Sequence, residues 1–352
     1  MALFSIPDIG ITGICSAVPG VVADNLEVSL LPENERDAFV RWVGIRRRRI
    51  AAPSICASDL CVAAAERLLI ETGDKPADIG ALVFVTQTPD FLLPGNSMLV
   101  QKRLGLSTST ILLDLNQGCA GYVYGMATLS GIMSSAGIKK GLLLVGDTLS
   151  RLISPQDKST VPIFSDAGSA TLLKYSPASS PLSFNLGSDG GGATAIYVRD
   201  GGARHPFGKD SLELQEIEPG IRRTPANLAM QGVDVLQYVF RYVVPNILEL
   251  LEMAQWSISD PDFYIFHQAN RLLNEGLVKK LGLNVEKAPE SLMDFGNTCS
   301  ATIPVTLNHR LHRTLSEGTY KLLLSGFGVG FSWGSALMQL DSLVCPEIVE
   351  LN

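Results

Sequence analysis

The chain has 352 residues, of which 46% are hydrophobic and 18% are charged, and its formal net charge at pH 7 is −7. A chain of this length can bury a large core and predicts about two domains. The acidic balance argues against nucleic acid as a partner, and no run approaches the roughly 18 consecutive apolar residues of a membrane-spanning helix.

The first eight residues lack the basic region and the cleavable apolar segment of an export signal, so we expect a cytoplasmic protein. Six cysteines form no Cys-x-x-Cys pair, and we expect most of them to be reduced and buried. We expect no metal site, because His309 and His312 have no convergent set of cysteines or carboxylates around them in the sequence.

Short apolar runs alternate with amphipathic patterns along the chain. A helix is predicted over 57–72, a strand over 81–86, a second strand over 142–146 and a long helix over 233–253. This alternation is typical of a layered α/β architecture with buried central sheets.

Cys119 is the first residue that points to chemistry. It lies where the strand-like run 111–113 meets Gly118 and a small-residue pattern that predicts a helix to about residue 136. A thiol in the first turn of a buried helix is favoured as the thiolate by nearby backbone N–H groups and by the helix dipole. A single cysteine is more often a buried structural residue, so a catalytic role depends on partners.

Two later segments offer such partners. His267 ends the predicted strand 263–266, and Asn297 follows Gly296 in a turn before another predicted helix. A cysteine with a distant histidine and asparagine can form a catalytic group, because the fold brings them together. Taken singly, His267 reads more readily as a core residue and Asn297 as a turn residue.

The chain also repeats itself loosely. The tripeptide Gly-Ser-Ala occurs at 168–170 and again at 334–336, and the apolar strand 142–146 has a counterpart at 322–326. A Pro/Ser-rich stretch at 175–181 reads as the connection between two halves. We expect a first half over 1–178 that carries the cysteine, and a second half over 179–352 that carries the histidine and the asparagine.

Cys119, His267 and Asn297, in this order and in these contexts, resemble the catalytic triad of the ketoacyl-acyl carrier protein synthase III family of the thiolase superfamily. The resemblance extends over nearly the whole chain, and its motifs lie at 44–53, 86–90, 163–170, 267–270, 296–298 and 326–336. It implies the five-layered αβαβα thiolase fold and a homodimer.

The resemblance also implies a reaction. Cys119 would take an acyl group from a thioester, with the backbone N–H groups of Cys119 and Val329 stabilising the oxyanion. His267 and Asn297 would then hold the carbonyl oxygen of malonyl-acyl carrier protein during decarboxylation and condensation. Acyl-coenzyme A or acyl-carrier protein would be the donor, and no cofactor is implied beyond these substrates.

Two other readings of the same scaffold stay open. An acyltransferase would pass the acyl group to an alcohol or an amine, and a non-catalytic partner subunit would only complete a dimer. A thiolase that uses a second cysteine as its base is disfavoured, because Cys299 and Cys345 lie outside the expected motifs.

The substrate-side residues depart from the family pattern. Ala38 stands where the family has a tryptophan that stacks on adenine, with Trp42 one turn away, and Lys158 aligns with an arginine that faces it. Leu93 takes the place of an aromatic gate to the acyl pocket, and Val329 replaces a common glycine. These departures favour a carrier-protein donor or an unusual acyl group.

Basic residues suggest where a carrier protein would dock. Arg271, Lys279 and Lys280 follow His267 on a predicted helix and fit the family's docking surface. The arginine run 46–49 has two open readings: a solvated strand with alternating faces, or a second docking element for an acidic carrier.

Overall fold

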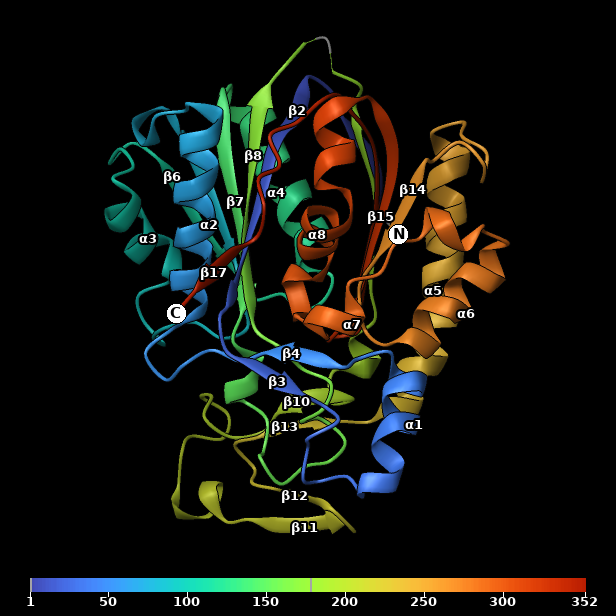
Figure 1. Cartoon of the computed structure of the whole chain (residues 1–352). Coiled ribbons are helices and arrows are strands. Elements are labelled where there is room, and N and C mark those ends of the chain that lie inside the picture. Colours follow the sequence, from blue (N-terminus) through green and yellow to red (C-terminus); the bar gives the residue numbers. More distant parts are fainter. Residues whose placement is uncertain (1, 178) are drawn as a thin grey trace.

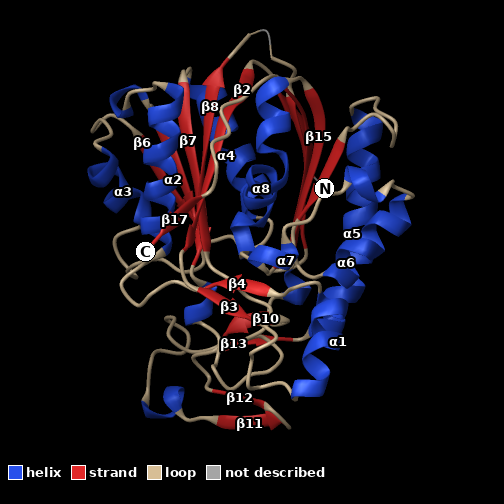
Figure 2. Cartoon of the chain, viewed as in Figure 1, coloured by secondary structure: helices blue, strands red, loops and turns tan. Residues whose placement is uncertain are grey.

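The computed structural model describes residues 2–177 and 179–352, with the side chains of residues 233 and 234 excepted. Its strands form two large sheets (Figure 1, Figure 2). The six-stranded sheet has the order β17-β2-β8-β7-β5-β6, with β2 (Ile9–Pro19), β5 (Ala81–Val85), β6 (Ile111–Leu115), β7 (Lys140–Asp147), β8 (Ala167–Tyr175) and β17 (Val349–Leu351). The five-stranded sheet has the order β1-β9-β16-β15-β14, with β1 (Ala2–Ile6), β9 (Leu182–Ser188), β14 (Phe263–Phe266), β15 (Tyr320–Gly328) and β16 (Ser332–Leu340).

Helices cover both sheets and fill the space between them (Figure 1). The outer face of the six-stranded sheet carries α2 (Ala57–Thr72) and α3 (Asn96–Leu104), and the outer face of the five-stranded sheet carries α5 (Gly232–Met253) and α6 (Arg271–Leu281). Between the sheets lie α4 (Gly121–Ala136) and α8 (Thr302–Glu317). The order helix, sheet, helix, sheet, helix is the expected five-layered architecture, which is thereby confirmed.

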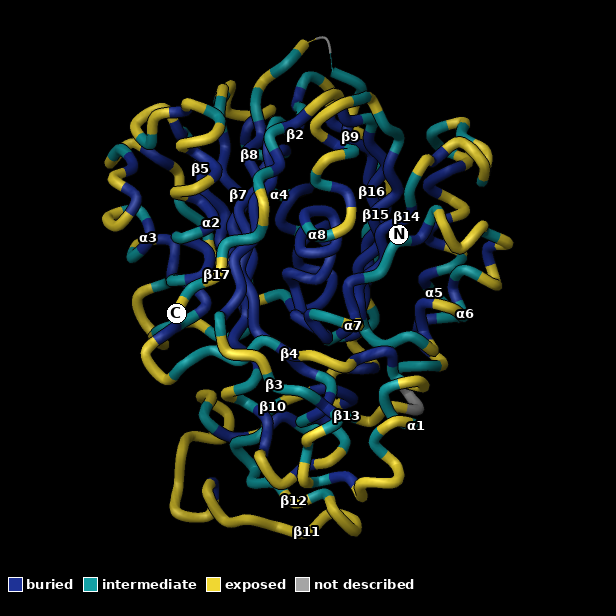
Figure 3. Tube along the Cα trace, in the orientation of Figure 1, coloured by how far each residue is buried: buried dark blue, intermediate teal, exposed yellow. Residues whose placement is uncertain are grey.

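The remaining elements lie mostly at the lower end of the sheets in Figure 1. They include α1 (Glu33–Val43), α7 (Leu292–Phe295) and the two-stranded pairs β3 (Val22–Asp24) with β4 (Arg47–Arg49), β10 (Ile196–Val198) with β13 (Leu228–Met230), and β11 (Gln215–Glu218) with β12 (Ile221–Arg223). The 3-10 helices are η1 (Pro76–Asp78), η2 (Leu149–Arg151), η3 (Gly190–Gly192), η4 (Lys209–Leu212), η5 (Val285–Lys287) and η6 (Cys299–Ala301). The β11–β12 pair is largely exposed (Figure 3).

Burial explains why these segments adopt their structures. All five residues of β5 are buried, because helices cover both faces of its sheet, and an uninterrupted apolar run is the pattern of such a strand. The glycines of α4 let the helix approach the sheet closely: a Cβ at Gly125 would lie 2.7 Å from Leu143 Cδ1. More than half of the residues of helix α4 and helix α8 are buried (Figure 3), as expected of helices packed between two sheets.

The two halves repeat one topology. The strand order β2-β8-β7-β5 in the first sheet is matched by β9-β16-β15-β14 in the second. In both, the second and third strands pair antiparallel, and the third and fourth pair parallel. Helix α4 leads into β7 as α8 leads into β15, so the prediction of two similar halves is confirmed.

Each half also lends a terminal strand to the other sheet. Strand β1 pairs antiparallel with β9, and β17 pairs parallel with β2. The predicted boundary at residue 178 lies outside the described residues and stays a prediction. Within the described part of the chain, no helix is both long enough and apolar enough to cross a membrane.

Candidate active site

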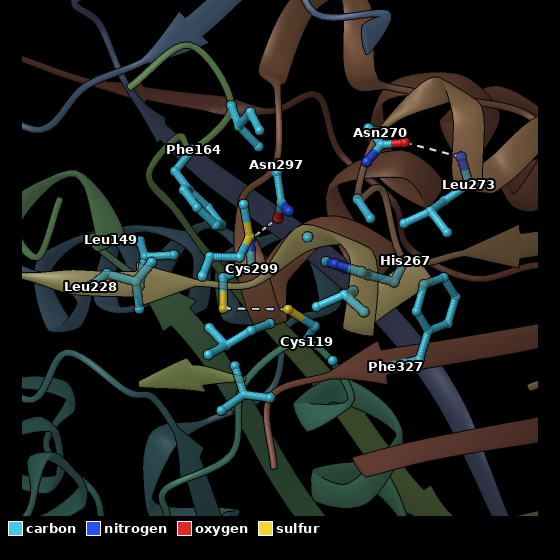
Figure 4. A pocket seen from close by; sticks show the side chains of 18 of the residues that line it. Cys119, Leu149, Phe164, Leu228, His267, Asn270, Leu273, Asn297, Cys299 and Phe327 are labelled. Atoms are coloured by element: carbon cyan, nitrogen blue, oxygen red, sulfur yellow. Dashed lines mark hydrogen bonds between the residues drawn. The ribbon is translucent and has the colours of Figure 1, made fainter. Parts of the chain in front are cut away.

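Segments from both halves meet in one pocket between the central helices and the end of β15. Cys119, His267, Asn297 and Val329 all line it, together with Cys299. Figure 4 shows the two sulfur atoms facing each other, with the side chains of His267 and Asn297 close by. The structure therefore brings the four predicted active-site residues together, and their catalytic roles stay predictions.

Cys119 lies at the junction of β6 and α4. The helix begins at Gly121 with Ala120 as its N-cap, so Cys119 immediately precedes the helix instead of lying within its first turn as predicted. Two glycines of β15 make room for it: a Cβ at Gly328 would lie 2.8 Å from Cys119 Sγ, and a Cβ at Gly326 would lie 2.9 Å from the Cys119 carbonyl oxygen.

The surroundings of Cys119 favour the thiolate. Its pKa is lowered well below the ordinary value, first by a hydrogen bond from the Cys299 thiol and then by the charge and hydrogen bond of His267. The backbone N–H of Val329 also stabilises the thiolate, whereas burial opposes it. A buried sulfur anion with several donors around it is a suitable nucleophile.

A hydroxyl group sets the orientation of His267. The Thr302 Oγ1 atom lies 2.7 Å from His267 Nδ1 and 3.1 Å from the Cys299 carbonyl oxygen. Its single proton can serve one of these acceptors at a time. When the hydroxyl donates to Cys299 O, it accepts from Nδ1–H and leaves Nε2 as an acceptor. When it donates to Nδ1, Nε2 carries the proton, so His267 can be either a base or a donor toward the pocket.

The amide of Asn297 is oriented by the backbone. Its Oδ1 accepts the N–H of Cys299 at 2.9 Å, which leaves both protons of Nδ2 available to a bound substrate. The backbone of Asn297 is held on both sides, since its N–H donates to Ile163 O at 3.0 Å and its carbonyl accepts from Ser165 at 2.9 Å. The preceding Gly296 has φ +60°, a conformation that favours glycine.

Cys299 is a site residue that the sequence did not reveal. Its Sγ lies 4.0 Å from Cys119 Sγ and 3.9 Å from Gln87 Oε1, and its backbone has φ +53°. Its pKa is raised well above the ordinary value by the hydrogen bond to Cys119, by burial and by the charge of Asp147. The motif of Cys299 differs from that of a thiolase base, yet its sulfur lies in the pocket.

Asp147 ties the two halves together behind the pocket. At the end of β7, its carboxylate accepts the Ser300 hydroxyl at 2.5 Å and the Gln87 N–H at 2.7 Å. Burial raises its pKa to about 6 despite these bonds. Because Ser300 lies just before α8, this carboxyl connects the start of a second-half helix to a first-half strand. No local pattern in the sequence marks it.

The predicted substrate-side residues lie apart from the pocket. Trp42 on α1 is 71% exposed, Leu93 in the loop before α3 is 87% exposed, and Lys158 is exposed near Gly220. None of these three occurs among the described residues that line the pocket. Their roles in substrate binding stay predictions.

The predicted docking residues differ in how free they are. Arg271 packs against Gly44 and donates from Nη1 to the carbonyl of Arg41 at 3.0 Å, so its guanidinium also joins α6 to α1. Lys279 and Lys280 are exposed at the end of the same helix, and Lys280 Nζ lies 5.3 Å from the ring centre of Phe240.

The arginine run 46–49 is paired within the chain. Arg46 contacts Asp24, Arg47 contacts Asp294, Arg49 contacts Glu350, and the buried Arg48 donates to Asn25. This pattern favours the reading as a strand with alternating faces over the docking reading.

Comparison with known proteins places the geometry in context. The family described as 3-oxoacyl-[acyl-carrier-protein (ACP)] synthase III matches residues 113–190, and its C-terminal part matches residues 251–340. The first range contains Cys119, and the second contains His267, Asn297 and Val329.

Individual relatives match over most of the chain. A β-ketoacyl-[acyl-carrier-protein] synthase III of Desulfitobacterium hafniense is 31% identical, with 94% of this chain and 97% of the relative covered. The crystal structure of a 3-oxoacyl-(acyl-carrier protein) synthase from Burkholderia xenovorans superposes with a TM-score of 0.93 at 34% identity over 99% of both chains. The priming β-ketosynthase of the R1128 polyketide pathway superposes with a TM-score of 0.80 at 25% identity, over 98% of this chain and 99% of that one.

Proposed function

Since this chain belongs to the 3-oxoacyl-[acyl-carrier-protein] synthase III family, we propose that it is a condensing enzyme. It would load an acyl group onto Cys119 and extend it with malonyl-carrier protein. One observation carries the assignment of roles: a stabilised thiolate, a histidine that can present either tautomer, and an asparagine with a free amide line the same pocket.

The loading step uses the bare Nε2 of His267. The Cys119 proton passes to Nε2 and leaves the thiolate. The thiolate sulfur then attacks the thioester carbonyl, and the oxyanion accepts hydrogen bonds from the backbone N–H groups of Cys119 and Val329. The tetrahedral intermediate then collapses, and the carrier thiolate leaves with the proton from Nε2. The acyl group remains on Cys119, and His267 is neutral again.

The condensation step uses the other tautomer. With Thr302 donating to Nδ1, the Nε2–H of His267 and the Nδ2–H of Asn297 both donate to the carbonyl oxygen of the malonyl thioester. The carboxylate leaves as carbon dioxide, and its bonding electrons form an enolate that these two donors stabilise. The enolate carbon attacks the acyl carbonyl on Cys119, and the thiolate is expelled to give the β-ketoacyl product.

The pocket supports an apolar acyl group. Leu149, Phe164, Leu228 and Met230 line it beyond the sulfur, and Figure 4 shows the first three side chains around Cys119 and Cys299. The length of the acyl chain and its donor, coenzyme A or a carrier protein, are the open variables of this proposal.

We assign docking of the acidic carrier protein to Lys279 and Lys280, with Arg271 contributing where α6 meets α1. Exposed basic side chains attract an acidic partner mainly by steering it during association.

We also propose a homodimer built on the loop before α3. Phe91, Leu92 and Leu93 are 60%, 87% and 87% exposed, an unusual apolar run for a free surface. In a dimer of this kind Leu93 would border the partner's acyl pocket.

The experiment is intact-protein mass spectrometry with a panel of acyl-coenzyme A and acyl-carrier donors, followed by a malonyl-carrier chase, with Cys119→Ala as the control. The proposal expects an adduct on Cys119 that the chase converts into a β-ketoacyl product. An adduct that ignores malonyl-carrier protein would instead support acyl transfer to an alcohol or an amine. No adduct with any donor would support a non-catalytic subunit.

A further inference from the structure

The second thiol in the pocket stabilises the Cys119 thiolate but forms no covalent bond in the proposed reaction. Cys119 and Cys299 lie 180 positions apart in the chain, yet their sulfur atoms are 4.0 Å apart, and Figure 4 marks this contact with a dashed line. A disulfide has an S–S distance of about 2.0 Å, so the two sulfurs need to approach by about 2 Å, shared between two side chains that can turn about χ1.

We propose that Cys119 and Cys299 are an oxidisable pair that a peroxide converts reversibly into a disulfide. The modification takes the nucleophile out of use and protects it from irreversible oxidation. It goes beyond the condensing activity, because it concerns the state of two thiols and needs no acyl donor.

The two thiols differ in ionisation and in access to the pocket, as a reaction with peroxide at one of them requires. Cys119 is the thiolate of the pair and lines the pocket that a thioester must enter, so a peroxide can reach it. Cys299 is 1% exposed and keeps its proton, which makes it a poor first target. Oxidation therefore begins at Cys119.

The first step is written for hydrogen peroxide. The Cys119 thiolate attacks one peroxide oxygen, the O–O bond breaks, and the hydroxide that leaves takes a proton to become water. Cys119 is now a sulfenic acid. His267, which contacts the Cys119 sulfur, is placed to supply that proton.

The second step resolves the sulfenic acid. The main cause that raises the pKa of Cys299 is its hydrogen bond to the Cys119 thiolate, and a neutral sulfenic acid removes that cause. The Cys299 sulfur attacks the Cys119 sulfur, the S–O bond breaks, and the hydroxide leaves as water with the Cys299 proton. Two thiols and one peroxide thus give one disulfide and two waters, and a dithiol reductant reverses the change.

Backbone hydrogen bonds fix the position of Cys299 beside Cys119. The Cys299 N–H donates to Asn297 Oδ1, and the Cys299 carbonyl accepts the Thr302 hydroxyl, so the backbone of this residue is fixed beside Cys119. Its thiol already lies against the Cys119 sulfur, the atom with which the disulfide would form.

The test maps thiols in the native chain after treatment with hydrogen peroxide, using alkylation of free thiols, proteolysis and mass spectrometry. The proposal expects a cross-linked Cys119–Cys299 peptide that dithiothreitol removes. Acyl loading should be lost in proportion to the cross-linked fraction and regained on reduction.

Two variants make the result decisive. Cys299→Ser should form no cross-link, and its Cys119 should proceed to sulfinic acid, which dithiothreitol does not reverse. Cys56→Ser removes a half-buried thiol elsewhere and should behave like the parent. The proposal is overturned if peroxide yields no Cys119–Cys299 peptide, or if the parent and Cys299→Ser lose and regain Cys119 reactivity alike. Because mapping uses no substrate, this outcome is separate from any failure of the condensing activity.

Discussion

The two halves place equivalent helices at the pocket, but the cysteines that precede these helices differ in pKa. Helix α4 leads into β7, and helix α8 leads into β15, in the same place of the same topology. A cysteine precedes each helix closely, Cys119 before Gly121 and Cys299 before Thr302. The pKa of the first thiol is lowered, whereas the pKa of the second is raised.

The difference arises from neighbours, not from the helix ends. The first cause is the hydrogen bond between the two thiols, which lowers the pKa of Cys119 and raises that of Cys299. Cys119 also faces His267 and the Val329 N–H, which stabilise a negative charge, whereas Cys299 faces the buried carboxyl of Asp147, which opposes one. A position near a helix N-terminus is therefore not sufficient to activate a thiol. In the proposed reaction, the second half instead contributes the groups that polarise a carbonyl.

The largest expected effect is on acyl loading, which should depend on the thiol of Cys119 and not on that of Cys299. Cys119→Ala should reduce acyl loading by at least about 10⁴-fold although Cys299 is present, because Cys299 keeps its proton. Cys299→Ala should still form the adduct. Intact mass after incubation with an acyl donor measures both, and an adduct at Cys299 in Cys119→Ala would show that the two thiols are interchangeable.

The next effect tests the hydroxyl that serves both tautomers of His267. Thr302→Val leaves Nδ1 without its partner at 2.7 Å, and a buried polar atom without a partner costs about 1–3 kcal/mol, or roughly 5- to 150-fold in rate. The rate of condensation in a single turnover should therefore decrease by a factor within that range. Thr302→Ser retains the hydroxyl and should stay near the parent, so equal losses in both variants would point to packing instead.

A smaller effect concerns the pH at which Cys119 ionises. Loss of the Cys299 thiol removes the main stabilising donor, so Cys299→Ala should raise the pKa of Cys119. The rate of Cys119 alkylation by iodoacetamide, measured against pH, should shift its midpoint upward. Cys299→Ser keeps a donor and should shift it less; an unchanged or lower midpoint in Cys299→Ala would remove this role.

The smallest effect concerns the docking helix of the second half. Charge reversal at Lys279 and Lys280 should lower kcat/KM for the carrier substrate about tenfold at low salt, and the loss should shrink as salt screens the charges. The matched control reverses the charges of Lys75 and Lys139, which are both exposed. Lys139 lies just before β7, at the end of this strand that is away from Asp147. Equal kinetics for both double variants would refute docking at α6.

Local patterns were enough to predict much of this fold. The helix predicted over 57–72 is α2 in full, the strand over 81–86 is β5 apart from its last residue, and the helix predicted to about residue 136 ends there. The residue pattern of each segment reflects how it is buried: β5 is an apolar run in a sheet covered by helices, and α4 is a helix of small residues between two sheets. The order of Cys119, His267 and Asn297 in their motifs was likewise readable in the chain.

The rest depends on contacts that the sequence does not display. Cys299, Thr302 and Asp147 reach the pocket or its back wall because η6, which leads into α8, packs against β7, and nothing in their local sequence marks them. The residues next to Cys299 in the chain gave no sign that its sulfur lies beside Cys119, because a motif describes sequence neighbours and not positions in space. The roles of Trp42 and Lys158 were inferred from alignment alone, and both residues lie away from the pocket.

Asn297→Asp tests whether the first half carries the acyl group while the second half activates the malonyl unit. This substitution keeps an oxygen to accept the Cys299 N–H and removes the amide donor. Time-resolved intact mass spectrometry would follow formation of acyl-Cys119 and then its consumption by malonyl-carrier protein. Loading should be nearly parental, and the rate of consumption should fall by about a hundredfold or more. Loading and consumption that fall together, or consumption that is unchanged, would contradict the division of labour between the halves.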